Sequence, residues 1–186
     1  LSGSSVVTQP EEVRRKIGFL TSELKLEDFF TPDYLYDFFS ELYGIPTDRR
    51  DARKRMLFAR FGIQEFAQVR VRDLSTGMKQ KVSLVISLVQ DPEIIIFDEP
   101  TNGLDILTAK VVTDFLLDLK EQGKTIIIST HIFSLVEKIC DRVGIIINGR
   151  MAACEDLRTL CGDKSLEDRF FEIYEAVNGE EENHDK

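Results

Sequence analysis

Two adjacent carboxylates, Asp98 and Glu99, directly follow the apolar run 94–97. Such a run is typical of a buried β-strand, and its C-terminal end lies at the sheet edge where α/β folds bind ligands. Phosphoryl transfer suits this pair, because it needs a metal ion to neutralise charge and a group to orient water. We expect Asp98 to hold Mg2+ through water and Glu99 to orient or deprotonate the hydrolytic water. Exposed carboxylates ending a strand are the alternative, but Thr-Asn-Gly-Leu-Asp at 101–105 favours the catalytic interpretation.

A second group of small residues, Ser75, Thr76 and Gly77, precedes a helical pattern with apolar positions 82, 85, 86 and 89. Backbone N–H groups at a helix N-terminus, together with the helix dipole, can hold phosphate oxygens. Gly77 permits close approach and Ser75 adds a hydroxyl group. The alternative is that Ser75 only caps the helix.

His131 is one of two histidines in the chain and comes two residues after the apolar segment 125–129. It lies about one βαβ unit past Glu99, so it could contact a terminal phosphate at the same sheet edge. An incidental histidine at a strand end is the alternative.

Two other patterns are rejected as functional sites. Gly123, Lys124 and Thr125 resemble the end of a phosphate-binding loop, G-x-x-x-x-G-K-[ST]. The earlier glycine position is Asp118, however, and the segment leads into a strand rather than a helix. The basic run at 49–60 lacks the interleaved aromatic residues of a nucleic-acid platform, so we interpret it as a solvated helix face.

The elements that position these residues alternate between strands and helices. Strands are predicted at 17–20, 93–98, 125–129 and 143–147, and their continuous aliphatic residues indicate a parallel sheet covered on both faces. The predicted helices lie at 10–16, 106–120 and 132–139, with an inserted helical lobe at about 31–71. Asn148 and Gly149 predict a hairpin. A last amphipathic helix begins near Ser165, and the acidic tail 179–186 is expected to be disordered.

Composition limits the function classes. The 186 residues, 42% of them hydrophobic, suit one domain, which we place at 1–178. The net charge of −9 disfavours nucleic acid as the main partner. The three cysteines are odd in number and form no CxxC pair, which favours reduced thiols in a cytoplasmic protein.

Taken together, the motifs resemble the ATP-binding subunit of an ABC transporter, and more narrowly that of bacterial exporters with a separate membrane subunit, sodium exporters included. Segment 74–80 stands where that family has its signature, with Thr76 in place of the usual glycine. Segment 94–100 matches Walker B and its catalytic glutamate. Asp105 matches the D-loop, and His131 matches the switch histidine.

The resemblance also shows two departures. Ser22 stands where the family has its Q-loop glutamine, so Ser22 or Glu23 is expected to contact the metal-bound water instead. The chain also begins after the place of Walker A. We therefore expect an N-terminal truncation that removes a strand–P-loop–helix unit of roughly 30 residues, and we expect this chain alone to be inactive while its parent is an ATPase.

The resemblance implies a P-loop NTPase-type α/β fold, with a mostly parallel sheet flanked by helices and an inserted α-helical lobe. It implies ATP and Mg2+ as cofactors, and as partners a membrane subunit and a second ATPase subunit in a head-to-tail dimer. The expected location is cytoplasmic, peripheral on the inner face of the membrane. Two alternatives stay open, namely a non-catalytic interaction module and a soluble ABC ATPase of translation or DNA repair.

Overall fold

The chain forms two compact units, Leu1–Ser129 and Thr130–Lys186. The computed structural model describes residues 3–21 and 26–184. The division falls at the end of a strand, whereas the sequence analysis placed one domain at 1–178. Each unit has its own sheet, so each is described by itself.

The first unit is built on a three-stranded parallel sheet. Its strands β1 (Ile17–Leu20), β2 (Ile94–Asp98) and β3 (Thr125–Ser129) lie in the order β1-β2-β3. Helix α1 (Pro10–Lys16) runs directly into β1, with acidic residues in its first turn and basic residues in its last, as the helix dipole favours. Parallel pairing brings the C-terminal ends of the strands to one edge of the sheet.

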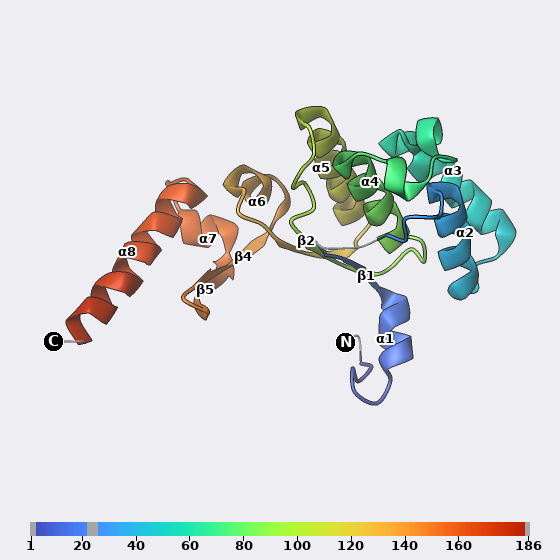
Figure 1. The fold of residues 1–186 in the computed structure, drawn as a ribbon. Coiled ribbons are helices and arrows are strands. Elements are labelled where there is room, and N and C mark those ends of the chain that lie inside the picture. The colour runs from blue at the N-terminus through green and yellow to red at the C-terminus, as the bar shows by residue number, and fades with distance from the viewer. Residues whose placement is uncertain (1–2, 22–25, 185–186) are drawn as a thin grey trace. The chain divides into compact units, whose positions relative to one another are not determined.

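Helices α4 (Thr76–Ser87) and α5 (Ile106–Glu121) lie on one face of this sheet (Figure 1). Their inward faces are fully buried, with apolar residues at the three- and four-residue spacing of a helix. Gly18 allows the end of α4 to approach β1 closely, because a Cβ there would lie 2.6 Å from the Ser87 carbonyl oxygen. The α/β fold expected from the sequence is confirmed.

The other face of the sheet carries a row of register partners, Phe19, Ile96 and Ile127. Phe19 is 55% exposed and Ile127 is 54% exposed, with Ile96 half-buried between them. The expected burial of both faces is therefore wrong for the described part of the chain. An aliphatic run shows that both faces of a strand are apolar, but it does not show which segment covers each face.

The inserted lobe consists of α2 (Pro32–Leu42), α3 (Thr47–Phe61) and the short 3-10 turns Ile63–Phe66 and Val71–Asp73. The Thr31 hydroxyl caps α2 by accepting a hydrogen bond from the Tyr34 N–H at 3.2 Å. Gly62 ends α3 in the left-handed conformation that glycine tolerates. The helical lobe predicted at about 31–71 is thus present.

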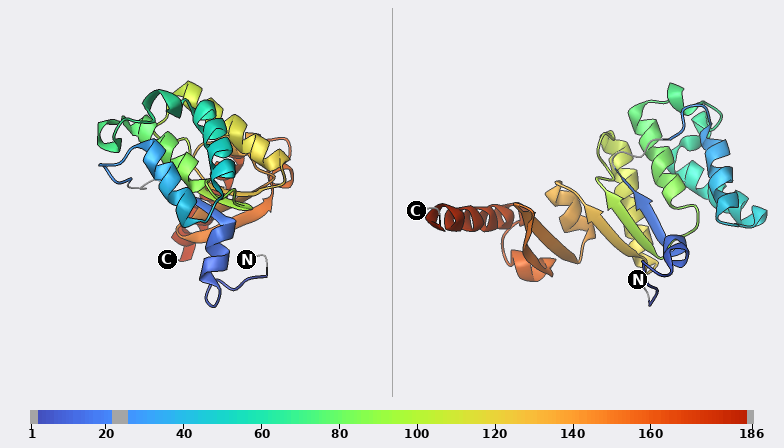
Figure 2. Two further views of the ribbon diagram at one scale, coloured as in Figure 1. Left: turned by 90° about the vertical axis from the view of Figure 1, so that its right-hand side faces the viewer. Right: turned by 60° about the horizontal axis from the view of Figure 1, so that its bottom comes forward.

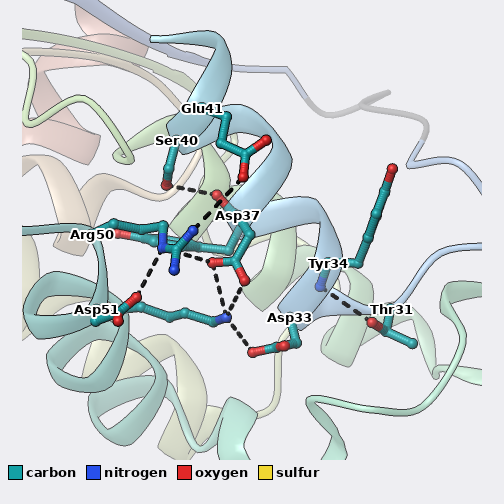
Figure 3. Close-up of polar contacts among 10 residues, drawn as sticks. Thr31, Asp33, Tyr34, Asp37, Ser40, Glu41, Arg50 and Asp51 are labelled. Carbon is teal, nitrogen blue, oxygen red and sulfur yellow. Dashed lines mark hydrogen bonds and ion pairs between the residues drawn. The ribbon is translucent and has the colours of Figure 1, made fainter. Parts of the chain in front are cut away.

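Ion pairs join α2 to α3 (Figure 3). Arg50 lies 3.3 Å from Asp37 and also pairs with Asp51, and Lys54 pairs with both Asp33 and Asp37. Arg50 and Lys54 belong to the basic run of the sequence analysis, and their side chains are mostly covered. Part of that run therefore holds the lobe together rather than forming only a solvated face.

The second unit contains α6 (Phe133–Ile139), the strands β4 (Arg142–Ile147) and β5 (Arg150–Asp156), α7 (Leu157–Cys161) and α8 (Leu166–His184). The strands form the predicted hairpin, and Asn148 and Gly149 both have the positive φ that a type I′ turn requires. β4 pairs antiparallel with β5 in a separate sheet, so it does not extend the parallel sheet of the first unit.

Helix α8 follows the hairpin and the short helix α7 as one long helix (Figure 2). The Ser165 hydroxyl accepts a hydrogen bond from the Asp168 N–H at 3.0 Å, which confirms the predicted helix start. Leu166 packs into a small core with Ile145, Ile147 and Leu160. The helix continues to His184, so it extends into the segment 179–186 that the sequence analysis expected to be disordered.

Candidate functional site

Two polar side chains meet where β2 and β3 end. Asp98 is the last residue of β2, Ser129 is the last residue of β3, and the two are register partners. The Ser129 hydroxyl donates a hydrogen bond to Oδ1 of Asp98. The apolar residues 94–97 before Asp98 are buried or half-buried, and those before Ser129 are half-buried apart from the exposed Ile127. These hydrophobic strands carry the two polar ends to the rim of the sheet.

Glu99 begins a tight turn directly after β2. Its φ is +47°, a left-handed conformation that costs a residue with a side chain roughly 1–2 kcal/mol. Two backbone hydrogen bonds hold it there. The Glu99 N–H donates to the Ser129 carbonyl at 2.9 Å, and the Asn102 N–H donates to the Glu99 carbonyl at 3.0 Å. The catalytic carboxylate proposed from the sequence therefore sits on a defined backbone rather than a loose loop.

Ser75 caps helix α4. Its hydroxyl accepts a hydrogen bond from the Met78 N–H at 3.3 Å, as the capping interpretation of the sequence expects. Ser75 and Thr76 are exposed and Gly77 is half-exposed, so this helix start is accessible from solvent. The cap uses the Ser75 hydroxyl oxygen as an acceptor, whereas phosphate binding would use the proton of that hydroxyl and the nearby backbone N–H groups as donors. The observed cap therefore leaves the second role a prediction.

Asp105 caps helix α5 in the same way. Its carboxylate accepts hydrogen bonds from the Thr108 hydroxyl at 2.7 Å and from the Thr108 N–H at 3.0 Å. These bonds lower the pKa of Asp105 below its ordinary value, and the bond from the Thr108 hydroxyl has the largest effect. Asp105 is therefore ionised at neutral pH, at the start of a helix whose dipole favours negative charge.

The starts of α4 and α5 lie close together. A Cβ at Gly77 would lie 3.8 Å from the Gly103 carbonyl oxygen and 3.9 Å from Leu104. Likewise, a Cβ at Gly103 would lie 3.9 Å from the Thr76 methyl group. Because Gly103 lies only four residues after Glu99, one short segment links the strand-end carboxylates to the residues 75–77.

A family model for ABC transporters matches residues 2–102, which is more than half of the chain. This chain belongs to the ABC transporter ATP-binding family. The ATP-binding protein NatA of Bacillus subtilis (strain 168) is 38% identical over 169 residues, covering 90% of this chain and 69% of NatA. A fluoroquinolones export ATP-binding protein of Mycobacterium tuberculosis (strain CDC 1551 / Oshkosh) is 36% identical over 118 residues, covering 63% of this chain and 38% of that protein.

Solved structures agree with this assignment. The cassette matches an ATP-binding subunit of an ABC transporter with a TM-score of 0.87 and 27% identity, covering 93% of this chain and 74% of that chain. It also shares its fold with the dimeric ATP-binding cassette MJ0796, solved with ADP and Pi, at a TM-score of 0.72 and 23% identity, covering 84% and 69%. In the described part of the cassette, no helix is both long and apolar enough to cross a membrane.

The cassette brings some predicted site residues together and leaves others untested. Asp98 and Glu99 share the sheet edge, and the segment 75–77 lies close to residues 103–104, just before Asp105. His131 lies in the second unit, two residues past the end of β3, and its contact with a terminal phosphate stays a prediction. Ser22 and Glu23 lie outside the described residues.

The donor atoms at the strand ends fit Mg2+. Among the described residues there is no group of three or more side chains that could form a complete metal cage from protein ligands. One or two carboxylates are instead what Mg2+ uses when substrate phosphates and water supply its other ligands. Asp98 would hold the ion, and Ser129 would act on Asp98.

Sequence reasoning missed Ser129 as part of the site. It treated this serine only as the end of a strand. The available signal was that two neighbouring parallel strands of five residues both end in a polar residue. It also missed Thr108, whose hydroxyl holds Asp105.

Proposed function

We propose that this cassette is the ATP-binding and ATP-hydrolysing subunit of an exporter, and that it acts on a separate membrane protein. The observation that carries the proposal is the pair Asp98 and Glu99 at the end of β2, held by Ser129 of β3. Family membership supports it, and so do relatives named for the export of fluoroquinolones and of Nod factor. The resemblance includes sodium exporters, but the cargo is selected by the membrane subunit and is not part of this proposal.

The chain's own residues would divide the hydrolytic step as follows. Asp98 holds Mg2+, which when bound neutralises charge on the phosphates of ATP. Glu99 would accept a hydrogen bond from the attacking water and take its proton as the oxygen attacks the γ-phosphorus. The bond from that phosphorus to the β,γ-bridging oxygen would break at the same time, so that ADP leaves and phosphate is released. His131 would contact the γ-phosphate, and Ser22 or Glu23 would contact the water bound to the ion. Each of these roles is an expectation from residue type and motif order.

A second copy of the chain would complete the site. The solvent-accessible segment 75–77 would bind the γ-phosphate of ATP held by the other subunit, through the Ser75 hydroxyl and the N–H groups that start α4. Asp105, ionised and fixed by Thr108, would lie at the same head-to-tail interface. The complex would sit at the inner face of the membrane.

The helical lobe offers a surface for the membrane subunit. A cavity of about 870 Å³ lies between α2, α4 and β1, lined mainly by apolar side chains. Tyr34 and Phe38 of α2 line it and are about half exposed, with Phe30 stacked on Tyr34. Exposed aromatic residues around a concave site are typical of protein interfaces, where they supply much of the binding energy. We place a cytoplasmic segment of the membrane subunit here.

Replacing Glu99 by Gln tests the proposed catalysis. In the full-length protein reconstituted with its membrane subunit, Glu99→Gln should lower ATP turnover by roughly 10²–10⁴-fold, because a general base is lost. Binding of MgATP should remain. Glu93→Gln is the matched control, since Glu93 is exposed just before the other end of the same strand.

Three outcomes would count against this proposal. Equal loss of ATP binding and turnover in Glu99→Gln would contradict a role as base. An equal effect of Glu93→Gln would point to strand stability instead. A wild-type protein that binds its membrane partner without hydrolysing ATP would favour the non-catalytic interaction module.

A further inference from the structure

We propose that Ser129 is a positioning residue that fixes the Asp98 carboxylate for Mg2+. The inference rests on the proposed ATPase function and adds one residue to it. Ser129 does not itself touch the ion or the nucleotide in this proposal. It acts through the hydrogen bond that its hydroxyl donates to Oδ1 of Asp98.

The sheet makes this contact reproducible. Asp98 and Ser129 are the last register pair of β2 and β3, after four pairs that begin at Ile94 and Thr125. Five consecutive parallel pairs fix the separation of the two strand ends, so the serine reaches the carboxylate without any loop having to order. A hydrogen bond to one carboxylate oxygen restricts rotation about the Asp98 Cβ–Cγ bond. Outer partners of this kind orient metal-binding carboxylates in proteins.

Ser129 also acts on Glu99, through different atoms. Its backbone carbonyl accepts the Glu99 N–H at 2.9 Å, whereas its side chain holds Asp98. One residue of β3 therefore fixes both adjacent carboxylates of β2. Replacing the side chain removes only the contact with Asp98, because any residue keeps the carbonyl. The effect on the metal can thus be separated from the effect on the turn at Glu99.

The size of the effect follows from the chemistry of the ion. Removing an outer partner of a metal ligand typically lowers metal affinity 10–100-fold. Mg2+ is also held by nucleotide phosphates and water, so the serine contributes only part of the affinity for Mg2+. We therefore expect a shift of about tenfold, at the lower end of that range.

The experiment compares Ser129→Val with Ser129→Thr in the full-length protein. The two variants have nearly the same shape and both suit a strand, but only threonine keeps the hydroxyl. Binding of a non-hydrolysable ATP analogue is measured by calorimetry over a Mg2+ titration. Ser129→Val should raise the Mg2+ concentration for half-maximal effect about tenfold, and Ser129→Thr should stay within about twofold of wild type. Analogue binding in EDTA should be the same for all three proteins.

Thr125→Val provides a matched control, because Thr125 is an exposed residue at the other end of β3. It should leave the Mg2+ dependence unchanged. In an Asp98→Asn background, Ser129→Val should have no further effect on the Mg2+ dependence, since the two residues act as one unit. Additive effects would overturn the proposal.

Two results would remove the role of Ser129 while leaving the proposed function intact. One is an unchanged Mg2+ dependence in Ser129→Val, with Glu99→Gln still deficient in turnover. The other is an equal shift in the Val and Thr variants, which would indicate a packing effect rather than a hydroxyl effect. Loss of Mg2+-dependent analogue binding in the wild-type protein would instead contradict the proposed function itself.

Discussion

Two groups of carboxylates in the first unit are held in different ways. In the helical lobe, Asp37 of α2 is bridged by Arg50 and Lys54 of α3, long cationic side chains that cross from one helix to the other (Figure 3). At the end of β2, Asp98 is held by the short side chain of Ser129, and the backbone of Glu99 is held by the Ser129 carbonyl.

The difference follows from what each group has to do. An ion pair between helices adds modest stability and tolerates small movements, because its charged ends are long and flexible. A carboxylate that binds a metal must instead be held in one orientation, which short donors on neighbouring strands provide. The same residue type thus stabilises the lobe in one place and serves the predicted chemistry in the other.

The largest expected effect comes from making the same change, aspartate to asparagine, in each of the two groups. Asp98→Asn should lower ATP turnover roughly 10²–10³-fold, because the electrostatic contact to the metal is weakened. Asp37→Asn should leave turnover within about twofold but lower the free energy of unfolding by about 1 kcal/mol, since it weakens two ion pairs. Steady-state ATPase assays and urea unfolding curves measure the two quantities.

The comparison between the groups breaks down if the two variants show the same pattern. A large loss of stability in Asp98→Asn would mean that its carboxylate mainly supports the fold. A large loss of turnover in Asp37→Asn would mean that the lobe takes part in catalysis.

A second prediction concerns the partner surface of the lobe. Phe38→Asp should weaken binding to the proposed membrane subunit roughly tenfold to a hundredfold, as expected for an aromatic anchor contributing ~2 kcal/mol. Phe171→Asp is the matched control, because Phe171 is 51% exposed on α8 and Phe38 is 47% exposed on α2. Affinity is measured with the membrane subunit in nanodiscs. Equal weakening by both variants would move the interface away from α2.

The smallest expected effect concerns a third carboxylate, Asp91, which forms ion pairs with the lobe and with the residue before β3. It lies 3.1 Å from Arg53 of α3 and 2.9 Å from Lys124 before β3. Burial on its own raises the pKa of Asp91, but the hydrogen bond from Lys124 and the charge of Arg53 outweigh it and hold that pKa below its ordinary value. Its ionised form is therefore favoured by folding.

Asp91→Asn should lower the free energy of unfolding at pH 7 by about 0.5 kcal/mol. Asparagine tolerates the φ of +54° at this position, so the substitution removes the charge without straining the backbone. A carboxyl group whose pKa is lowered by folding stabilises the native state at pH values above its pKa in the unfolded state, which is about 3.9. The difference between the proteins should disappear as the pH falls through the native pKa. Urea unfolding at pH 7, 5 and 3 measures it, with exposed Asp163→Asn as control. A difference that persists at pH 3 would contradict the charge interpretation.

Much of the fold could be predicted because its signals are local. The bounds of β3 and the hairpin at Asn148 and Gly149 follow from aliphatic runs and turn residues within a few positions. The position of Asp98 and Glu99 at a strand end is also local. The helical lobe was recognisable from the spacing of its apolar residues, although the ion pairs between its helices α2 and α3 were not.

The remaining features depend on contacts between distant segments. Ser129 meets Asp98 across 31 positions of sequence, and only the register of β2 and β3 brings them together. The left-handed backbone of Glu99 has no compositional signal, because glutamate is not a residue that favours that region. The exposure of Phe19 could not be predicted either, since its apolar character is the same whether or not another segment covers it.

The bare backbone of Gly18 has a mechanical consequence. Because Gly18 has no side chain, the backbone of β1 lies directly against the last turn of α4. The strand therefore cannot tilt toward the helix without displacing it. Helix α4 is a stiff rod about 18 Å long, and its far end carries Ser75. A displacement of β1 would therefore move Ser75 at the opposite end of the helix, and would couple the strand to the phosphate-binding and subunit-interface roles proposed for that end.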